Sequence, residues 1–173
     1  RKRRIIDEPD RFLKPIQRRL LRATQRWQLE HPAAYCGPKQ VSYVDAAREH
    51  ADAAWIVNRD VYDAFPSVTP GMVRRALVGR GFRADVVDLL VQLLTVRGRT
   101  PQGAPLSNFA INIAFYPLDQ LLASQCGRLG LRYTRYADDI NVSCPKRRLS
   151  KRPVRYPGVA TLSCYGEAGG QVG

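Results

Sequence analysis

The fold is decided by LRYTRYADDINVSC, residues 131–144. LRYTRY and INVSC read as two strands of a hairpin, and Ala137, Asp138 and Asp139 lie between them. Both flanking strands are apolar enough to be interior, so the turn would hold two like charges close together at the end of a sheet. Such an arrangement is costly unless a cation lies there. The alternative is a purely structural turn, because Asp tolerates turn geometry and prefers water.

A third carboxylate follows a second predicted strand. The run AAWIVNRD, residues 53–60, reads as a buried strand that ends at Asp60, and Asp63 is the near competitor. If this strand is a neighbour of the hairpin, Asp60, Asp138 and Asp139 converge at one sheet edge. Three carboxylates with open positions suit Mg²⁺, which keeps waters and substrate phosphates as its other ligands. Two such ions could activate a hydroxyl and stabilise a leaving pyrophosphate.

Helical patterns surround these strands. An amphipathic helix is expected over 10–29, with Phe12, Ile16, Leu20 and Trp27 on its apolar side. A short helix is expected near 45–53. Thr69 and Pro70 predict an N-cap and first helical position, and Gly79 and Gly81 predict the end of that helix. Further helices are expected over 84–96, with Val86, Val87, Leu90 and Leu94 on the apolar side, and over 107–124, where Pro117 should kink or interrupt the helix. The sequence therefore predicts an α+β fold with helices against an antiparallel sheet.

The charge balance points to a polyanionic partner. Lys and Arg number 28 against 15 Asp and Glu, a formal net charge of +13, which favours phosphate contacts and counterion release. On the helix over 10–29 the basic face is formed by Arg18, Arg19, Arg22 and Arg26. A merely solvated surface is the alternative, since ribosomal, membrane-surface and heparin-binding proteins share such a charge.

No apolar run approaches the ~20 residues that a membrane span requires, so we expect no membrane partner. The 4 Cys residues are widely separated, which favours reduced thiols and a cytoplasmic location.

Four motifs in order resemble those of bacterial reverse transcriptases, most closely the retron type. They are R-x-I-x-x-P-x-x-x-L-K-x-I-Q at 4–17, NRDVYDAFPSV at 58–68, TPQGAPLSNFAIN at 100–112 and YADD at 136–139. His31, Ala34 and His50 also fall roughly where these enzymes carry spaced His and Ala residues between the fingers and the palm. The resemblance covers about residues 4 to 144 and implies an RNA-directed DNA polymerase with the fingers and palm of a right-hand fold. It further implies two Mg²⁺ ions, with Mn²⁺ as a substitute, an RNA template, a DNA primer or RNA/DNA hybrid, and deoxynucleoside triphosphates.

The resemblance also assigns roles to residues. Asp60, with the Val61 carbonyl beside it, would be the first metal ligand, and Asp138 and Asp139 the paired aspartates of the palm. Phe65 occupies the steric-gate position, where a ring below the sugar excludes a 2′-hydroxyl, although a core Phe is the simpler alternative. In the nucleotide site the resemblance places Gln102, Gly103 and the triphosphate-gripping Arg4.

The resemblance suggests a domain layout: partial fingers over 1–53, palm over 54–144 with inserted fingers helices at 84–105, and a basic Pro- and Gly-rich tail over 145–173. We expect the tail to be poorly ordered and without a clear element. It offers no thumb, so we expect the chain alone to extend a primer poorly. A catalytically inactive nucleic-acid-binding remnant of a reverse transcriptase is the second hypothesis. A structured non-coding RNA or a protein is a further candidate partner.

Overall fold

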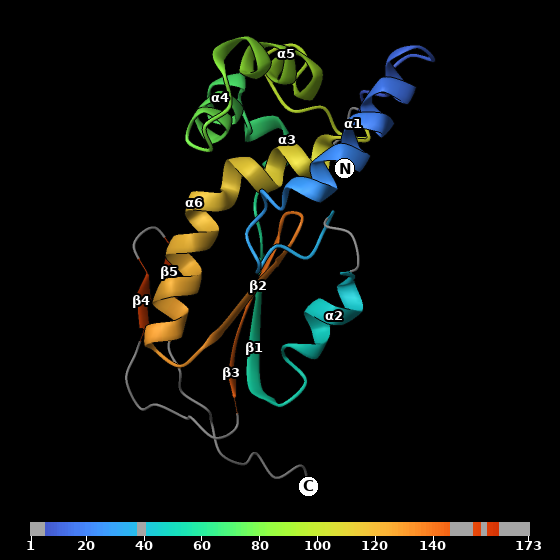
Figure 1. Ribbon diagram of the computed structural model, residues 1–173. Helices are drawn as coiled ribbons and strands as arrows, with labels where there is room; N and C mark the ends of the chain where they lie inside the picture. The colour runs from blue at the N-terminus through green and yellow to red at the C-terminus, as the bar shows by residue number, and fades with distance from the viewer. Residues whose placement is uncertain (1–5, 38–40, 146–153, 157–158, 163–173) are drawn as a thin grey trace, which may run out of the picture.

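The computed structural model describes residues 6–37, 41–145, 154–156 and 159–162. Figure 1 shows a group of helices at one end and a slender sheet flanked by helices at the other. The elements in chain order are α1 (Leu13–Trp27), α2 (Tyr43–Arg48), β1 (Ala53–Asp60), α3 (Ala64–Ser67), α4 (Pro70–Val78), α5 (Ala84–Leu94), α6 (Ser107–Arg128), β2 (Arg132–Tyr136), β3 (Asp139–Pro145), β4 (Val154–Tyr156) and β5 (Val159–Leu162).

The main sheet contains three antiparallel strands in the order β1-β3-β2. The predicted hairpin is confirmed: Tyr136 of β2 pairs with Asp139 of β3, which leaves Ala137 and Asp138 as the two turn residues. In Figure 1 the sheet lies between α6 on one side and α2 on the other. The predicted α+β class, with helices against an antiparallel sheet, is therefore confirmed.

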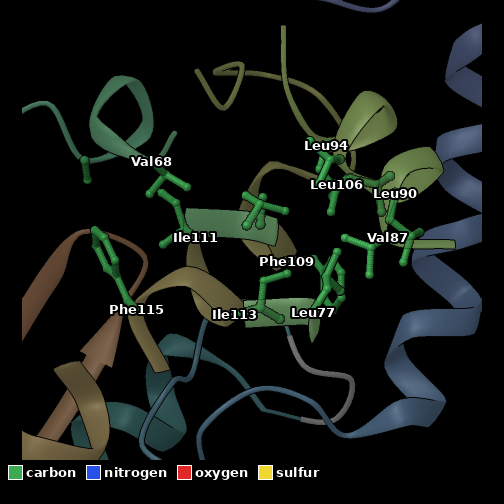
Figure 2. Close-up of a cluster of buried hydrophobic side chains, with 14 residues drawn as sticks. Val68, Leu77, Val87, Leu90, Leu94, Leu106, Phe109, Ile111, Ile113 and Phe115 are labelled. Carbon is green, nitrogen blue, oxygen red and sulfur yellow. The ribbon is translucent and has the colours of Figure 1, made fainter. Parts of the chain in front are cut away.

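The larger hydrophobic core lies at the helical end, between α4, α5 and the first half of α6. Figure 2 shows Leu77, Val87 and Leu90 facing Phe109 and Ile113 across this core.

The N-cap prediction is confirmed, because the Thr69 side chain accepts a hydrogen bond from the Met72 backbone N–H and Pro70 is the first helical residue. The cap fixes where α4 begins.

A smaller core joins the second half of α6 to the sheet, where Cys126, Leu131, Tyr133, Val142 and Cys144 are buried together. A single helix of 22 residues thus packs in both cores. Pro117 lies inside α6 without ending it, and the helix changes direction near its middle. Of the two predicted effects of Pro117, a kink or an interruption, the helix shows the kink.

The predicted burial of β1 is wrong. This strand is at the edge of the main sheet. Its residues alternate between half-buried and exposed, and the last three are all exposed. Ile56, for example, is 54% exposed. An apolar run alone does not distinguish a central strand from an edge strand, because that depends on which neighbours the fold supplies.

The predicted apolar side of the first helix is half right: Leu20 packs against the larger core and Trp27 packs edge-on against Phe82. Phe12 is 70% exposed and Ile16 is 55% exposed, whereas the residues of α1 that are buried are Gln17 and Thr24. The Gln17 side chain donates to the Leu93 carbonyl at 3.0 Å, which ties α1 to the end of α5. The helix therefore docks through polar groups as well as through the half-buried Leu20 and Leu21.

Smaller differences concern element ends and the tail. The helix expected near 45–53 is α2, Tyr43–Arg48, with a Ser42 and Asp45 capping box. Val86, on the predicted apolar side of α5, is 37% exposed. Within the tail, β4 and β5 pair as a two-stranded antiparallel sheet, so an element forms where no period in the sequence indicates one.

Two further observations concern membrane spans and cysteines. In the part of the chain that the structure describes, no helix is both long enough and apolar enough to cross a bilayer. Cys36, Cys126 and Cys144 are buried thiols, and Cys164 lies outside the described residues.

Candidate active site

The backbones that carry the three predicted aspartates meet at one end of the main sheet. Asp60, the last residue of β1, is the direct cross-strand partner of Asp139, the first residue of β3. The Val61 backbone N–H donates to the Asp138 carbonyl at 2.9 Å. The end of β1 is therefore bonded to the hairpin turn itself, and Asp60, Asp138 and Asp139 are neighbours although more than seventy residues separate them in the chain.

The hairpin turn has an unusual backbone. Ala137 has a φ of 54°, a left-handed value that is uncommon outside glycine, Asn and Asp. The Arg135 side chain donates from Nη1 to the Ala137 carbonyl at 2.7 Å. This carbonyl belongs to the peptide bond that leads into Asp138, so the orientation of that peptide is fixed from within the protein.

Polar side chains continue from the aspartates along the same face of the sheet. Asn58 pairs with Asn141 across the ladder, and its Nδ2 donates to Asn141 Oδ1 at 3.0 Å and to Asp139 Oδ1 at 3.5 Å. Side chains two apart on a strand share a face, which places Asn58 beside Asp60. Asn58 and Asn141 carry amides next to the carboxylates.

On that face, farther from the turn, His50 is buried against both strands of the hairpin. Its Nδ1 and Nε2 contact Ser143 Oγ at 2.6 Å and Thr134 Oγ1 at 2.8 Å. Burial, together with the positive charge of Arg132, lowers the pKa of His50. A neutral ring is thus favoured, and His50 joins the segment after α2 to the sheet.

The donor chemistry of the three aspartates suits a hard divalent cation. Asp60 is exposed and Asp138 and Asp139 are half-buried, so their oxygens can face solvent and substrate. Like charges directly opposite across a ladder are destabilising, and a bound cation would offset this repulsion. Among the described residues, however, no group of three or more His, Cys, Asp or Glu residues forms a ready-made metal cage. The carboxylates fit the ion by donor type, and the backbones that carry them meet at one sheet end.

A buried ion pair lies behind the turn, on the opposite face of the sheet. Arg135 and Asp119 are both 0% exposed, and the carboxylate accepts from Arg135 Nε at 2.8 Å and Nη2 at 2.7 Å. Tyr133 Oη donates to the same carboxylate at 2.6 Å, and Arg135 Nη1 donates to Asn112 Oδ1 at 3.1 Å. These groups link α6 to the hairpin, and sequence reasoning missed them. An Asp in a predicted buried helix and an Arg in a predicted interior strand were the available signal, because buried charges are paired.

The residues predicted for the nucleotide site fall in two places. Phe65 is in α3, half-buried against the larger core, which agrees with either of its alternative roles. The Gln102 carbonyl accepts from the Asp7 N–H at 2.9 Å. A Cβ on Gly103, whose φ is 103°, would come within 2.7 Å of Ile6 Cγ2. The close approach that Gly103 allows is thus to the chain's own N-terminal segment. Arg4 lies outside the described residues.

The predicted basic face of α1 is exposed, on the side of the helix away from Gln17 and Thr24. It consists of Arg18, Arg19, Arg22 and Arg26. Further cations lie nearby in the helical end, where Arg80 packs over the Tyr116 ring at 4.5 Å and donates to the Leu29 carbonyl at 2.9 Å. Arg80 is engaged within the protein, whereas the four α1 arginines are exposed.

Comparison with known proteins identifies the class to which this fold and site belong. The model of the family described as "Reverse transcriptase (RNA-dependent DNA polymerase)" matches residues 2–155. The chain belongs to the reverse transcriptase family.

The similar proteins are retron reverse transcriptases. The chain is 33% identical over 140 residues to the Retron Ec86 reverse transcriptase of Escherichia coli, covering 81% of this chain and 44% of that protein. It is 35% identical over 169 residues to the Retron Mx162 reverse transcriptase of Myxococcus xanthus, covering 82% of this chain and 35% of that protein. The Retron Mx65 reverse transcriptase of Myxococcus xanthus is 32% identical over 158 residues, covering 81% and 37% respectively. The chain therefore spans less than half the length of these relatives.

Proposed function

We propose that this chain carries the catalytic centre of an RNA-directed DNA polymerase, in which Asp60, Asp138 and Asp139 hold two divalent metal ions. The observation that supports this most is the pairing of Asp60 with Asp139, together with the hydrogen bond from Val61 to the Asp138 carbonyl. In a chain of the reverse transcriptase family, this arrangement brings the carboxylates of two separate motifs to one sheet end.

The ions would be Mg²⁺, with Mn²⁺ as a substitute, and the Val61 carbonyl would be a further ligand. When bound, such ions activate the primer hydroxyl and neutralise charge on the transferred phosphoryl group. The protein would contribute by positioning the metal ligands. The ladder holds Asp60 opposite Asp139, and the hydrogen bond from the Val61 N–H holds the turn against the end of β1. Phosphoryl transfer depends mainly on such positioning and on electrostatics.

Substrate contacts follow from residues around this sheet end. Phe65 would lie below the deoxyribose and exclude a 2′-hydroxyl, and Gln102 and Gly103 would line the nucleotide site. Arg4 would grip the triphosphate, and the hydrogen bond between Asp7 and Gln102 supports the proximity of its segment to that loop. The basic face of α1 would hold the RNA template or the RNA/DNA hybrid through phosphate contacts. A structured non-coding RNA is a candidate template, since the relatives are retron enzymes.

The two cores support a division into palm and fingers. The sheet with the second half of α6 would be the palm, within 54–144. The segment inserted at 84–105, which contains α5, would belong to the fingers with residues 1–53. The core of α4, α5 and the first half of α6 is separate from the core under the sheet. Residues 145–173 would be a separate basic tail.

A nucleic-acid-binding protein without polymerase activity is the second candidate, favoured by the exposed basic face of α1 and the net charge of +13. Extension of a DNA primer on an RNA template separates the two functions, because both bind the hybrid and only the polymerase adds nucleotides. We expect slow, metal-dependent addition of deoxynucleotides that Asp60→Asn and Asp139→Asn each abolish. Tight hybrid binding without addition by the wild-type chain would support the second candidate instead.

A further inference from the structure

The buried Arg135 and Asp119 pair lies directly behind the turn that carries Asp138. The Arg135 guanidinium is fully buried and bridges two elements: Nε and Nη2 bind the Asp119 carboxylate of α6, and Nη1 binds the Ala137 carbonyl in the turn. Only a planar fork of donors can make these contacts together, so Lys cannot replace them.

The turn needs such support. The positive φ of Ala137 costs free energy for a residue with a Cβ and persists only where the surroundings hold it. The peptide between Ala137 and Asp138 is held at its carbonyl by Arg135. One residue further on, the Asp138 carbonyl is held by Val61. The backbone of Asp138 is therefore fixed on both sides, by α6 through Arg135 and by β1 through Val61.

The guanidinium is itself held from several directions. Asp119 also accepts from Tyr133 Oη. Asn112 accepts from Arg135 Nη1, and its own Nδ2 donates to the Cys36 carbonyl at 2.6 Å. The backbone of Arg135 is bonded to the neighbouring segment as well, because its N–H donates to the Ala33 carbonyl at 2.8 Å and its carbonyl accepts from the Tyr35 N–H at 2.8 Å. A rigid cluster thus extends from α6 to the turn.

We propose that Arg135, oriented by Asp119 and Asn112, is a positioning residue that sets the orientation of the Asp138 carboxylate for metal binding. This inference rests on the proposed function. Partners that orient a metal ligand typically contribute about 10- to 100-fold to metal affinity. Arg135→Lys distinguishes positioning from simple charge. It keeps the positive charge, so a purely electrostatic role predicts unchanged Mn²⁺ binding, whereas a positioning role predicts weaker binding.

The test measures Mn²⁺ binding to the full chain by electron paramagnetic resonance, with thermal unfolding recorded on the same samples. We expect Arg135→Lys to weaken Mn²⁺ binding about 10- to 100-fold. The control is Arg132→Lys on the same strand, whose exposed side chain pairs with Asp52 instead. That control should bind Mn²⁺ like the wild type.

A second variant covers the case in which Arg135→Lys does not fold. Replacing a buried ion pair by apolar residues of similar volume is often neutral or stabilising, so the triple variant Arg135→Met, Asp119→Leu and Tyr133→Phe should remain folded without the hydrogen bond to Ala137. It should bind Mn²⁺ as weakly as Arg135→Lys. Wild-type or tighter Mn²⁺ binding by either folded variant would overturn the positioning role.

Asp138→Asn separates this inference from the function on which it rests. If Asp138→Asn binds Mn²⁺ like the wild type, the metal site itself is wrong and the proposed function fails. If Asp138→Asn loses Mn²⁺ binding while the folded Arg135 variants retain it, only the positioning role fails.

Discussion

Asp60 and Asp139 are direct partners across the β1 and β3 ladder, so two like charges stand opposite each other at an open sheet end. A pair of this kind destabilises a sheet by a few tenths to about 1 kcal/mol relative to a neutral pair. The protein therefore gives up some stability at the point where the candidate metal ligands lie.

Asp139→Asn should remove that repulsion. Without divalent metal, we expect the variant to unfold at a slightly higher temperature than the wild type, corresponding to at most about 1 kcal/mol. With Mg²⁺ or Mn²⁺ added, the wild type should gain stability because the ion binds only the folded state, and the variant should gain much less. Thermal unfolding with and without metal checks both expectations. An equal gain in the two proteins would mean that the ion binds elsewhere.

Neutralising the basic face of α1 should weaken nucleic-acid binding and its salt dependence together. For a variant in which Arg18, Arg19, Arg22 and Arg26 are all Gln, the slope of log affinity against log salt should fall by about 0.7–0.9 for each phosphate that is no longer neutralised. Fluorescence anisotropy with an RNA/DNA hybrid at several salt concentrations measures the slope. Arg48→Gln on α2, where Arg48 is exposed and paired with Asp45, is the control and should leave the slope unchanged.

Phe65→Ala should relax the choice of sugar, because it opens the volume that a ribose 2′-hydroxyl would occupy. The ratio of ribonucleotide to deoxynucleotide incorporation in primer extension should rise above that of the wild type. Phe82→Ala is the matched control, since Phe82 is also half-buried against the larger core and packs edge-on against Trp27. If both variants lose stability and neither changes the ratio, Phe65 is a core aromatic only.

Removing Asp119 should be far more damaging than removing an exposed carboxylate. Asp119→Ala leaves the Arg135 charge buried and unpaired, and we expect a loss of about 3–5 kcal/mol in the free energy of unfolding. Asp52→Ala breaks the exposed pair with Arg132 and should cost no more than about 1 kcal/mol. Urea unfolding of both variants makes the comparison. Similar losses would show that the buried cluster is less tightly packed than its hydrogen bonds indicate.

Local patterns predicted the parts of this fold that local physics determines. The hairpin at Ala137 and Asp138 and the N-cap at Thr69 each depend on a few adjacent residues, and both were confirmed. The apolar side of α1 was wrong at Phe12 and Ile16 because the contacts of α1 with α5, such as that of Gln17, come from distant sequence. The candidate site was predicted as a set of aspartates, but the Arg135 and Asp119 pair behind it joins a strand to a helix and has no periodic signature.

The proposed metal-dependent polymerase activity is tested by addition of a single nucleotide to a DNA primer on an RNA template, with the chain in excess over the hybrid and Mg²⁺ or Mn²⁺ present. Four templates that differ only in the templating base show whether the template directs the choice. We predict slow addition of the complementary deoxynucleotide on each template. Metal ions supply several kcal/mol of transition-state stabilisation, so Asp138→Asn should slow addition at least about 100-fold. Addition that ignores the templating base, or that Asp138→Asn leaves unchanged, would contradict the account.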